Sequence, residues 1–141
     1  MDSRQHPRGL VDTSVVIGLE LIDPQELPSA LAVSAVTMAE LAAGPHATSD
    51  PLERARRQDR LQRAEAVFDP LPIDADVARA YGRLYATVLA AGRKARGRRA
   101  FDLLIAATAL AAQLPLYTRN PDDFSDIAPL VEVIAVAPDS R

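Results

Sequence analysis

The fold is decided by the stretch Leu10–Ile17, which reads LVDTSVVI. Leu10 and Val11 predict the end of a short buried strand, and the polar run Asp12-Thr13-Ser14 is typical of the start of a helix. The acid therefore stands at the carboxyl end of a strand. In open parallel α/β sheets, ligand sites form at that edge, so Asp12 is our first candidate for a functional residue.

The same order of strand, polar residues and helix recurs along the chain. Apolar stretches predict further strands at 31–33, 115–118 and 131–136, and helical patterns cover 34–43, 50–67, 74–92 and 100–110. The segment 68–73 contains two prolines, so we expect an edge strand or extended chain there. Strands separated by helices indicate an α/β fold, with a central, mostly parallel sheet covered by helices on both faces.

Length and composition limit the classes of protein that this chain can represent. The 141 residues, 48% of them apolar, are enough for one domain over 1–141, in which we expect 1–8 and 138–141 to be flexible tails. The absence of cysteine excludes disulfides and thiolate metal sites. No apolar run approaches the ~20 residues of a membrane span, and no secretory signal is visible, so we expect a cytoplasmic protein.

Three acids stand where the surrounding pattern favours apolar residues. Asp12 follows a buried strand, Glu40 lies within MAELA, and Asp102 lies within FDLLI. Burying an unpaired carboxylate costs several kcal/mol, so such acids are usually paired with cations or bound to a metal. Oxygen ligands favour Mg²⁺ or Mn²⁺. A divalent cation held by carboxylates can activate water and bind phosphate oxygens, which favours phosphodiester hydrolysis.

Four sequence blocks, in this order, resemble a known family over nearly the whole chain. They are LVDTS at 10–14, AEL at 39–41, FDLLIAATA at 101–109 and YTRNPDDF at 117–124. Together they resemble PIN-domain ribonucleases, specifically VapC-type toxins. The resemblance implies a three-layer α/β/α fold, RNA cleavage dependent on Mg²⁺ or Mn²⁺, and inhibition by a VapB-type antitoxin whose tail occupies a groove near the site. It also implies a homodimer.

Matching these blocks position by position implies a role for each polar residue. Asp12 and Asp102 look like the two principal metal carboxylates, with Glu40 as a supporting acid. Asp123 looks like the fourth acid, because it directly precedes Phe124, although the adjacent Asp122 keeps that assignment open. Groups that would orient the carboxylates or water are Thr13, Ser14 and Asn120.

A basic segment without acids precedes Asp102. Positive charge there would bind the phosphate backbone of RNA without reading its sequence. The candidates for substrate contact are Arg93, Lys94, Arg96, Arg98, Arg99 and, in a separate block, Arg119. The arginines of 50–67 alternate with acids and are better explained as a solvated helix face.

Each acid also has a simpler explanation. Asp12 can cap the following helix, Glu40 can face solvent, and Asp102 can complement the dipole at the start of its helix. Only their joint occurrence favours a nuclease. Two alternative functions stay open: a catalytically silent PIN-like binding module, and a phosphotransfer enzyme using Asp12 as nucleophile. In the second, Ser14 stands where a haloacid-dehalogenase-type phosphatase has another Asp.

Overall fold

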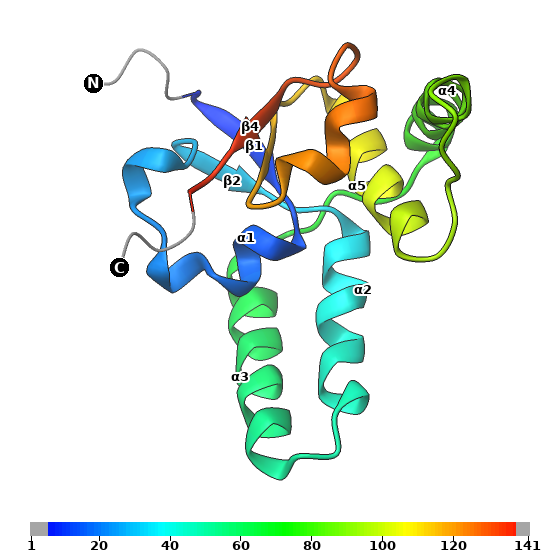
Figure 1. The fold of residues 1–141 in the computed structure, drawn as a ribbon. Coiled ribbons are helices and arrows are strands. Elements are labelled where there is room, and N and C mark those ends of the chain that lie inside the picture. Colours follow the sequence, from blue (N-terminus) through cyan, green and yellow to red (C-terminus); the bar gives the residue numbers. More distant parts are fainter. Residues whose placement is uncertain (1–5, 138–141) are drawn as a thin grey trace.

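A parallel β-sheet forms the centre of the molecule, as seen in the computed structural model, which describes residues 6–137 (Figure 1). Within these residues the strand order is β2-β1-β3-β4, and every pair of neighbours is parallel. The predicted mostly parallel sheet is therefore confirmed. The strands are β1 (Arg8–Val11), β2 (Ala30–Ala32), β3 (Leu116–Thr118) and β4 (Val133–Ala135).

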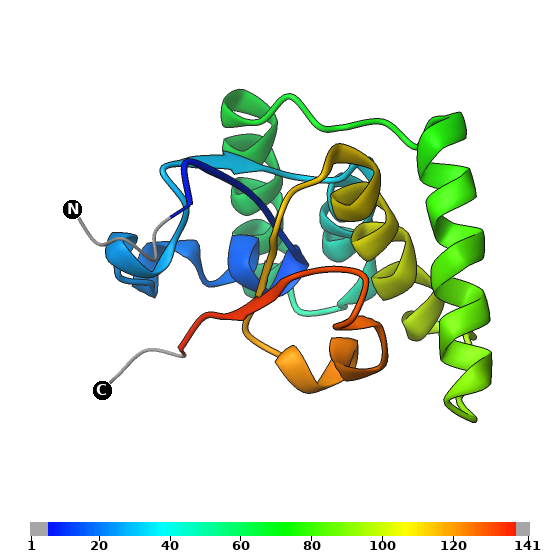
Figure 2. The same ribbon diagram turned by 90° about the horizontal axis from the view of Figure 1, so that it is seen from above.

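Helices cover both faces of this sheet, which makes three layers (Figures 1 and 2). Side chains alternate along a strand, so Leu10 packs with α4 and α5 whereas Val11 packs with α1, α2 and α3. Leu116 and Tyr117 of β3 divide in the same way. The helices are α1 (Thr13–Ile17), α2 (Ala35–Ala43), α3 (Pro51–Val67), α4 (Ala75–Ala90) and α5 (Arg98–Ala112).

The helix before the third strand begins earlier than the sequence suggested. We expected it from residue 100, but α5 begins at Arg98, after Gly97 with a φ of 59°. Asp102 is thus the fifth helical residue and lies beyond the first turn, where the helix dipole acts most strongly. The dipole explanation for Asp102 is weakened accordingly. None of the helices in residues 6–137 is both long and apolar enough to cross a bilayer.

The leading segment is more ordered than expected in its described part. We predicted a flexible tail to residue 8, but β1 begins at Arg8, and the carbonyls of His6 and Pro7 accept hydrogen bonds from the backbone N–H groups of Ser29 and Ala30, both at 3.0 Å. These bonds extend the β1–β2 ladder backwards. The remainder of the two predicted tails, 1–5 and 138–141, lies outside the described residues.

The proline-containing segment 68–73 is extended, as one of our two expectations had it. It makes a single parallel bridge, between Leu71 and Ser34, beside the end of β2. Leu71 donates to the carbonyl of Val33 and accepts from the N–H of Ala35, both at 2.9 Å. The segment therefore continues the sheet edge by one residue rather than by a full strand.

Gly9 is the position in β1 where a side chain would not fit. The ring of Tyr117, which is 2% exposed, lies across the central strand. A Cβ at position 9 would stand 2.5 Å from Cε1 of that ring and 3.0 Å from Cγ of Pro28. The close packing of β1 against β3 on this face therefore depends on glycine.

Candidate metal centre

Asp12 lies where β1 ends and α1 begins, and it is 5% exposed. Its Oδ1 accepts hydrogen bonds from the backbone N–H of Val15 at 3.1 Å and from Ser14 Oγ at 2.6 Å. Burial raises the pKa of Asp12, and hydrogen bonds from Ser14, Thr118 and Val15 partly oppose this increase. The capping role that we kept open is thus real, and the same carboxyl group also belongs to the site described below.

Glu40 reaches the site from α2. Thr13 Oγ1 donates to Glu40 Oε1 at 2.5 Å, and the same hydroxyl oxygen lies 3.0 Å from Thr37 Oγ1. Thr37 precedes Glu40 by three residues, so the two share one face of the helix. Glu40 is half-buried. The alternative explanation, that it is a fully solvated glutamate on a helix surface, is therefore wrong.

Asp102 has a pKa that the charges of neighbouring side chains change. Its pKa is raised from 3.8 to about 6, first by burial and then by the negative charges of Asp123, Glu40 and Asp12; the positive charge of Arg98 acts in the opposite direction. Three acids, from the end of β1, from α2 and from the segment after β3, are therefore close enough to Asp102 to repel its negative charge. Asp123 is the acid with the largest effect on Asp102, which favours Asp123 over Asp122 as the fourth acid.

The chemistry of this donor set fits a hard divalent cation. Among residues 6–137, no three acidic or imidazole side chains stand close enough together to hold a metal ion without adjustment. However, the negative charges of Asp123, Glu40 and Asp12 act on Asp102, and the positive charge of Arg98 offsets them only in part. A bound cation would relieve that repulsion. The residues that would hold it are Asp12 and Asp102, with Glu40 and Asp123 supporting them.

The three residues expected to orient these groups fall into two cases. Thr13 and Ser14 touch site carboxylates: Thr13 bonds Glu40, and Ser14 Oγ both donates to Asp12 and accepts from the N–H of Arg119 at 3.1 Å. Asn120 is exposed, and within the described chain its side chain bonds none of the four acids. Its backbone is engaged instead: the N–H donates to Thr118 Oγ1 at 3.0 Å, and the carbonyl accepts from the N–H of Asp123 at 3.1 Å.

Two threonines were missed by sequence reasoning. Thr118 is fully buried at the end of β3 and bonds Asp12, and Thr37 is fully buried beside Thr13. Thr118 carried the same signal as Asp12, a polar residue at the carboxyl end of a buried strand. Thr37 carried a weaker one, its helical spacing from Glu40.

The six basic residues predicted to contact substrate differ in their surroundings. Arg93 and Arg99 approach a carboxylate that sequence analysis did not single out, Asp126, with nitrogen-to-oxygen distances of 3.6 and 4.0 Å. The guanidinium of Arg119 packs over Gly18, where an added Cβ would stand 2.1 Å from Nη1. Lys94 and Arg96 in the loop are exposed, as is Arg98, whose charge acts on Asp102.

Comparisons with known proteins agree with this geometry. The family model described as "PIN domain" matches residues 10–130. Ribonuclease VapC5 of Mycobacterium tuberculosis is 38% identical over 133 residues, which cover 91% of this chain and 95% of that protein. Ribonuclease VapC8 of the same species is 39% identical over 102 residues, which cover 72% of this chain and 89% of that protein.

Solved structures give the same result. The VapBC-5 toxin–antitoxin structure from Mycobacterium tuberculosis contains a chain that superposes with a TM-score of 0.79 at 35% identity, covering 94% of this chain and 99% of that one. VapBC-1 from nontypeable Haemophilus influenzae gives 0.67 at 25% identity, with coverage of 88% and 95%. The chain described here therefore belongs to the PIN-domain family and, within it, to the VapC ribonucleases.

Proposed function

We propose that this protein is a Mg²⁺- or Mn²⁺-dependent endoribonuclease and the toxin of a VapBC toxin–antitoxin pair, acting in the cytoplasm. The observation that carries the proposal is that three other carboxylates, those of Asp123, Glu40 and Asp12, lie near enough to act on the half-buried Asp102 and, with its burial, raise its pKa to about 6. Like charges gather in this way at sites that bind a cation. Solved relatives are titled as VapBC toxin–antitoxin systems.

Some residues of the site would bind the cation, and others orient the carboxylates that bind it. A bound divalent cation would supply an activated water and stabilise charge on the phosphate. Asp12, at the junction of β1 and α1, and Asp102 of α5 would hold it through their carboxylates. Thr13 fixes the rotamer of Glu40 through the 2.5 Å bond, and Ser14 fixes Asp12. Arg98, exposed at the start of α5, is placed to contact an RNA phosphate beside the acids.

RNA cleavage by the purified protein tests this proposal. We expect cleavage with Mn²⁺ or Mg²⁺, none with a chelator, and a loss of about 100-fold or more in Asp102→Asn. Asp76→Asn is the matched control, because Asp76 is an exposed aspartate on α4 that pairs with Arg79 far from the acids. Wild-type protein that cuts no RNA with either ion, and that causes no growth arrest on expression, would contradict the proposal.

An antitoxin segment would find an apolar groove next to the acids. Val36, Ala39 and Ala43 of α2 face Phe101 across it, and Phe101 is 50% exposed. The remaining lining residues are Glu40, Gly97 and Arg98. A bound peptide would bury Phe101 and cover the approach to Glu40. We expect Phe101→Ser to weaken antitoxin binding while RNA cleavage persists, and equal affinity of both proteins in a calorimetric titration would exclude this groove.

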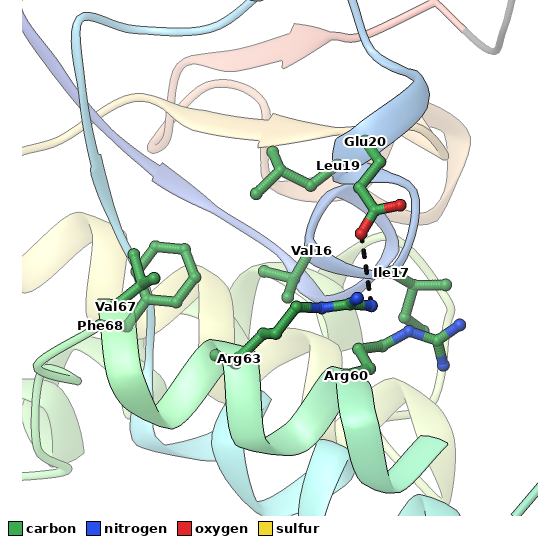
Figure 3. A pocket seen from close by; sticks show the side chains of 9 residues that line it. Val16, Ile17, Leu19, Glu20, Arg60, Arg63, Val67 and Phe68 are labelled. Carbon is green, nitrogen blue, oxygen red and sulfur yellow. Dashed lines mark ion pairs between the residues drawn. The ribbon is translucent and has the colours of Figure 1, made fainter. Parts of the chain in front are cut away.

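A second apolar hollow, of about 280 Å³, lies between α1 and α3 (Figure 3). Val16, Ile17 and Phe68 form part of its wall, and the Arg63–Glu20 ion pair at 3.3 Å spans its rim. This hollow offers an antitoxin further apolar contact outside the acidic site.

We also propose a homodimer in the absence of antitoxin. The exposed Tyr85 and Leu89 of α4, at 40% and 50%, form an apolar edge one helical turn long that a second copy would cover. Sedimentation of wild-type protein and Leu89→Glu would test it: a dimer that persists unchanged in the variant excludes this edge.

A further inference from the structure

Asp126 is a buried acid that none of the roles above uses. It lies in the 3₁₀ helix η4 (Pro121–Ile127), and its side chain is 15% exposed. Its Oδ2 is fully buried and, among the described residues, has no hydrogen-bond partner. Two guanidinium groups face it instead: Nε of Arg93 at 3.6 Å and Nη1 of Arg99 at 4.0 Å. A buried carboxylate with such neighbours is held by charge rather than by a hydrogen bond.

The position of Asp126 follows from the way η4 is anchored. Phe124 and Ile127, which are 3% and 1% exposed, fix η4 to the apolar cluster beneath α4 and α5. A 3₁₀ helix has three residues per turn, so Asp123 and Asp126 stand one above the other, in a row next to that of Phe124 and Ile127. One element therefore presents one acid to Asp102 and another to the arginines.

The arginines belong to the segment that leads into α5. Arg93 lies in the loop after α4, and Arg99 is the second residue of α5, three residues before Asp102. Arg99 Nη1 also approaches the backbone carbonyl of Asp123, at 3.4 Å. The same guanidinium thus contacts η4 at two of its three acidic residues, Asp123 and Asp126. This set of contacts ties the start of α5 to the segment after β3.

We propose that Asp126, together with Arg93 and Arg99, is a positioning device that keeps Asp123 and Asp102 near each other, so that a bound metal ion could draw both carboxylates together. The inference rests on the proposed function, because it assigns the device to the metal site. It changes the role of Arg93 and Arg99, which we had predicted to contact RNA, to that of ion-pair partners of Asp126. It also explains how two acids that repel each other stay in place on separate elements before the ion arrives.

The positioning role and a phosphate-binding role predict different effects when Arg93 and Arg99 are replaced. If Arg93 and Arg99 bind RNA phosphates, their loss raises KM and flattens the salt dependence of binding. If they position the acids, their loss lowers kcat and the affinity for Mn²⁺, while KM and the salt dependence stay as in wild type. Exposure favours positioning for Arg99, whose side chain is only 27% exposed, against 51% for Arg93.

The test is the variant Asp126→Asn, which keeps the shape of the side chain and removes its charge. We expect Mn²⁺ affinity, measured by calorimetry without RNA, and kcat each to fall by about 10-fold. Asp126→Glu should recover most of both, because it restores the charge. Asp76→Asn, which removes an exposed aspartate paired with Arg79, should leave both unchanged. Thermal unfolding of each variant identifies any loss of fold.

Three outcomes decide between the explanations. Unchanged Mn²⁺ affinity and kcat in folded Asp126→Asn would overturn the inference. A rise in KM alone would overturn it as well and return the arginines to substrate binding. If Asp126→Asn fails to fold, Arg99→Gln replaces it and must show the same fall in Mn²⁺ affinity. If wild-type protein neither binds Mn²⁺ nor cuts RNA, the proposed function fails and the result is distinct from all three.

Discussion

Replacing Asp102 by Asn should stabilise the metal-free fold at neutral pH and leave it unchanged at acidic pH. The pKa of Asp102 is raised from 3.8 to about 6 in the folded chain. The folded state therefore disfavours the ionised form, so wild-type stability is complete below about pH 4 and is lost as pH rises through about 6. Asparagine has no charge to bury and does not pay this cost.

The size of the effect follows from the two pKa values. The interval from 3.8 to about 6 corresponds to about 3 kcal/mol of unfolding free energy. Because the side chain is only half-buried, solvent screens part of this, and we expect about 1–2 kcal/mol above pH 7. Urea unfolding followed by circular dichroism, with a chelator present and from about pH 4 to about pH 8, measures it.

The comparison of wild type with Asp102→Asn, rather than either alone, isolates this group from other titrations. The difference in unfolding free energy should be close to zero near pH 4, grow through about pH 6 and level off above pH 7. Mn²⁺ should reverse its sign by stabilising the wild type. A difference that does not vary with pH would refute the reasoning, because the four carboxylates would then not interact in the folded chain.

Further substitutions probe the packing and the hydrogen bonds around the site. Gly9→Ala should lower the unfolding free energy by about 1–3 kcal/mol, since its Cβ would stand 2.5 Å from the Tyr117 ring; urea midpoints measure this, and an unchanged midpoint would mean that the ring moves aside at no cost. Thr13→Val should lower kcat by about 10-fold with the fold intact, because Glu40 loses its 2.5 Å partner; Thr13→Ser, which keeps the hydroxyl, should retain most activity.

Residues whose role depends on nearby sequence could be predicted. Asp12 was recognisable because a buried strand and a helix start flank it directly, and the structure places it at that junction. Glu40 and Asp102 were recognisable because each interrupts an apolar helical pattern. That Asp12 and Glu40 lie near enough to act on Asp102 agrees with the parallel sheet, since parallel strands bring their carboxyl ends to one edge.

Features that depend on distant packing could not be predicted in this way. The start of α5 has no side-chain cap and follows Gly97 in a positive-φ conformation, so RGRRA resembles a loop in the sequence. The partner of Arg93 and Arg99 lies 33 and 27 residues further along, and it meets them only because Phe124 and Ile127 anchor η4. Asn120 matched a family block, yet its side chain turns to solvent.

Asp12 both caps α1 and belongs to the proposed metal site, so inactivating substitutions at Asp12 and at Asp102 should differ in their effect on stability. Loss of its carboxylate removes the α1 cap as well as a metal ligand, and a lost cap costs about 1 kcal/mol. Loss of the Asp102 charge relieves repulsion instead. Null alleles at Asp102 should therefore accumulate as well-folded protein that still sequesters its inhibitor, whereas null alleles at Asp12 should be cleared faster by cellular proteases. In a cell that also carries a functional copy of the toxin gene, an Asp102 null protein would compete for the antitoxin. An Asp12 null protein would compete less, because less of it would remain.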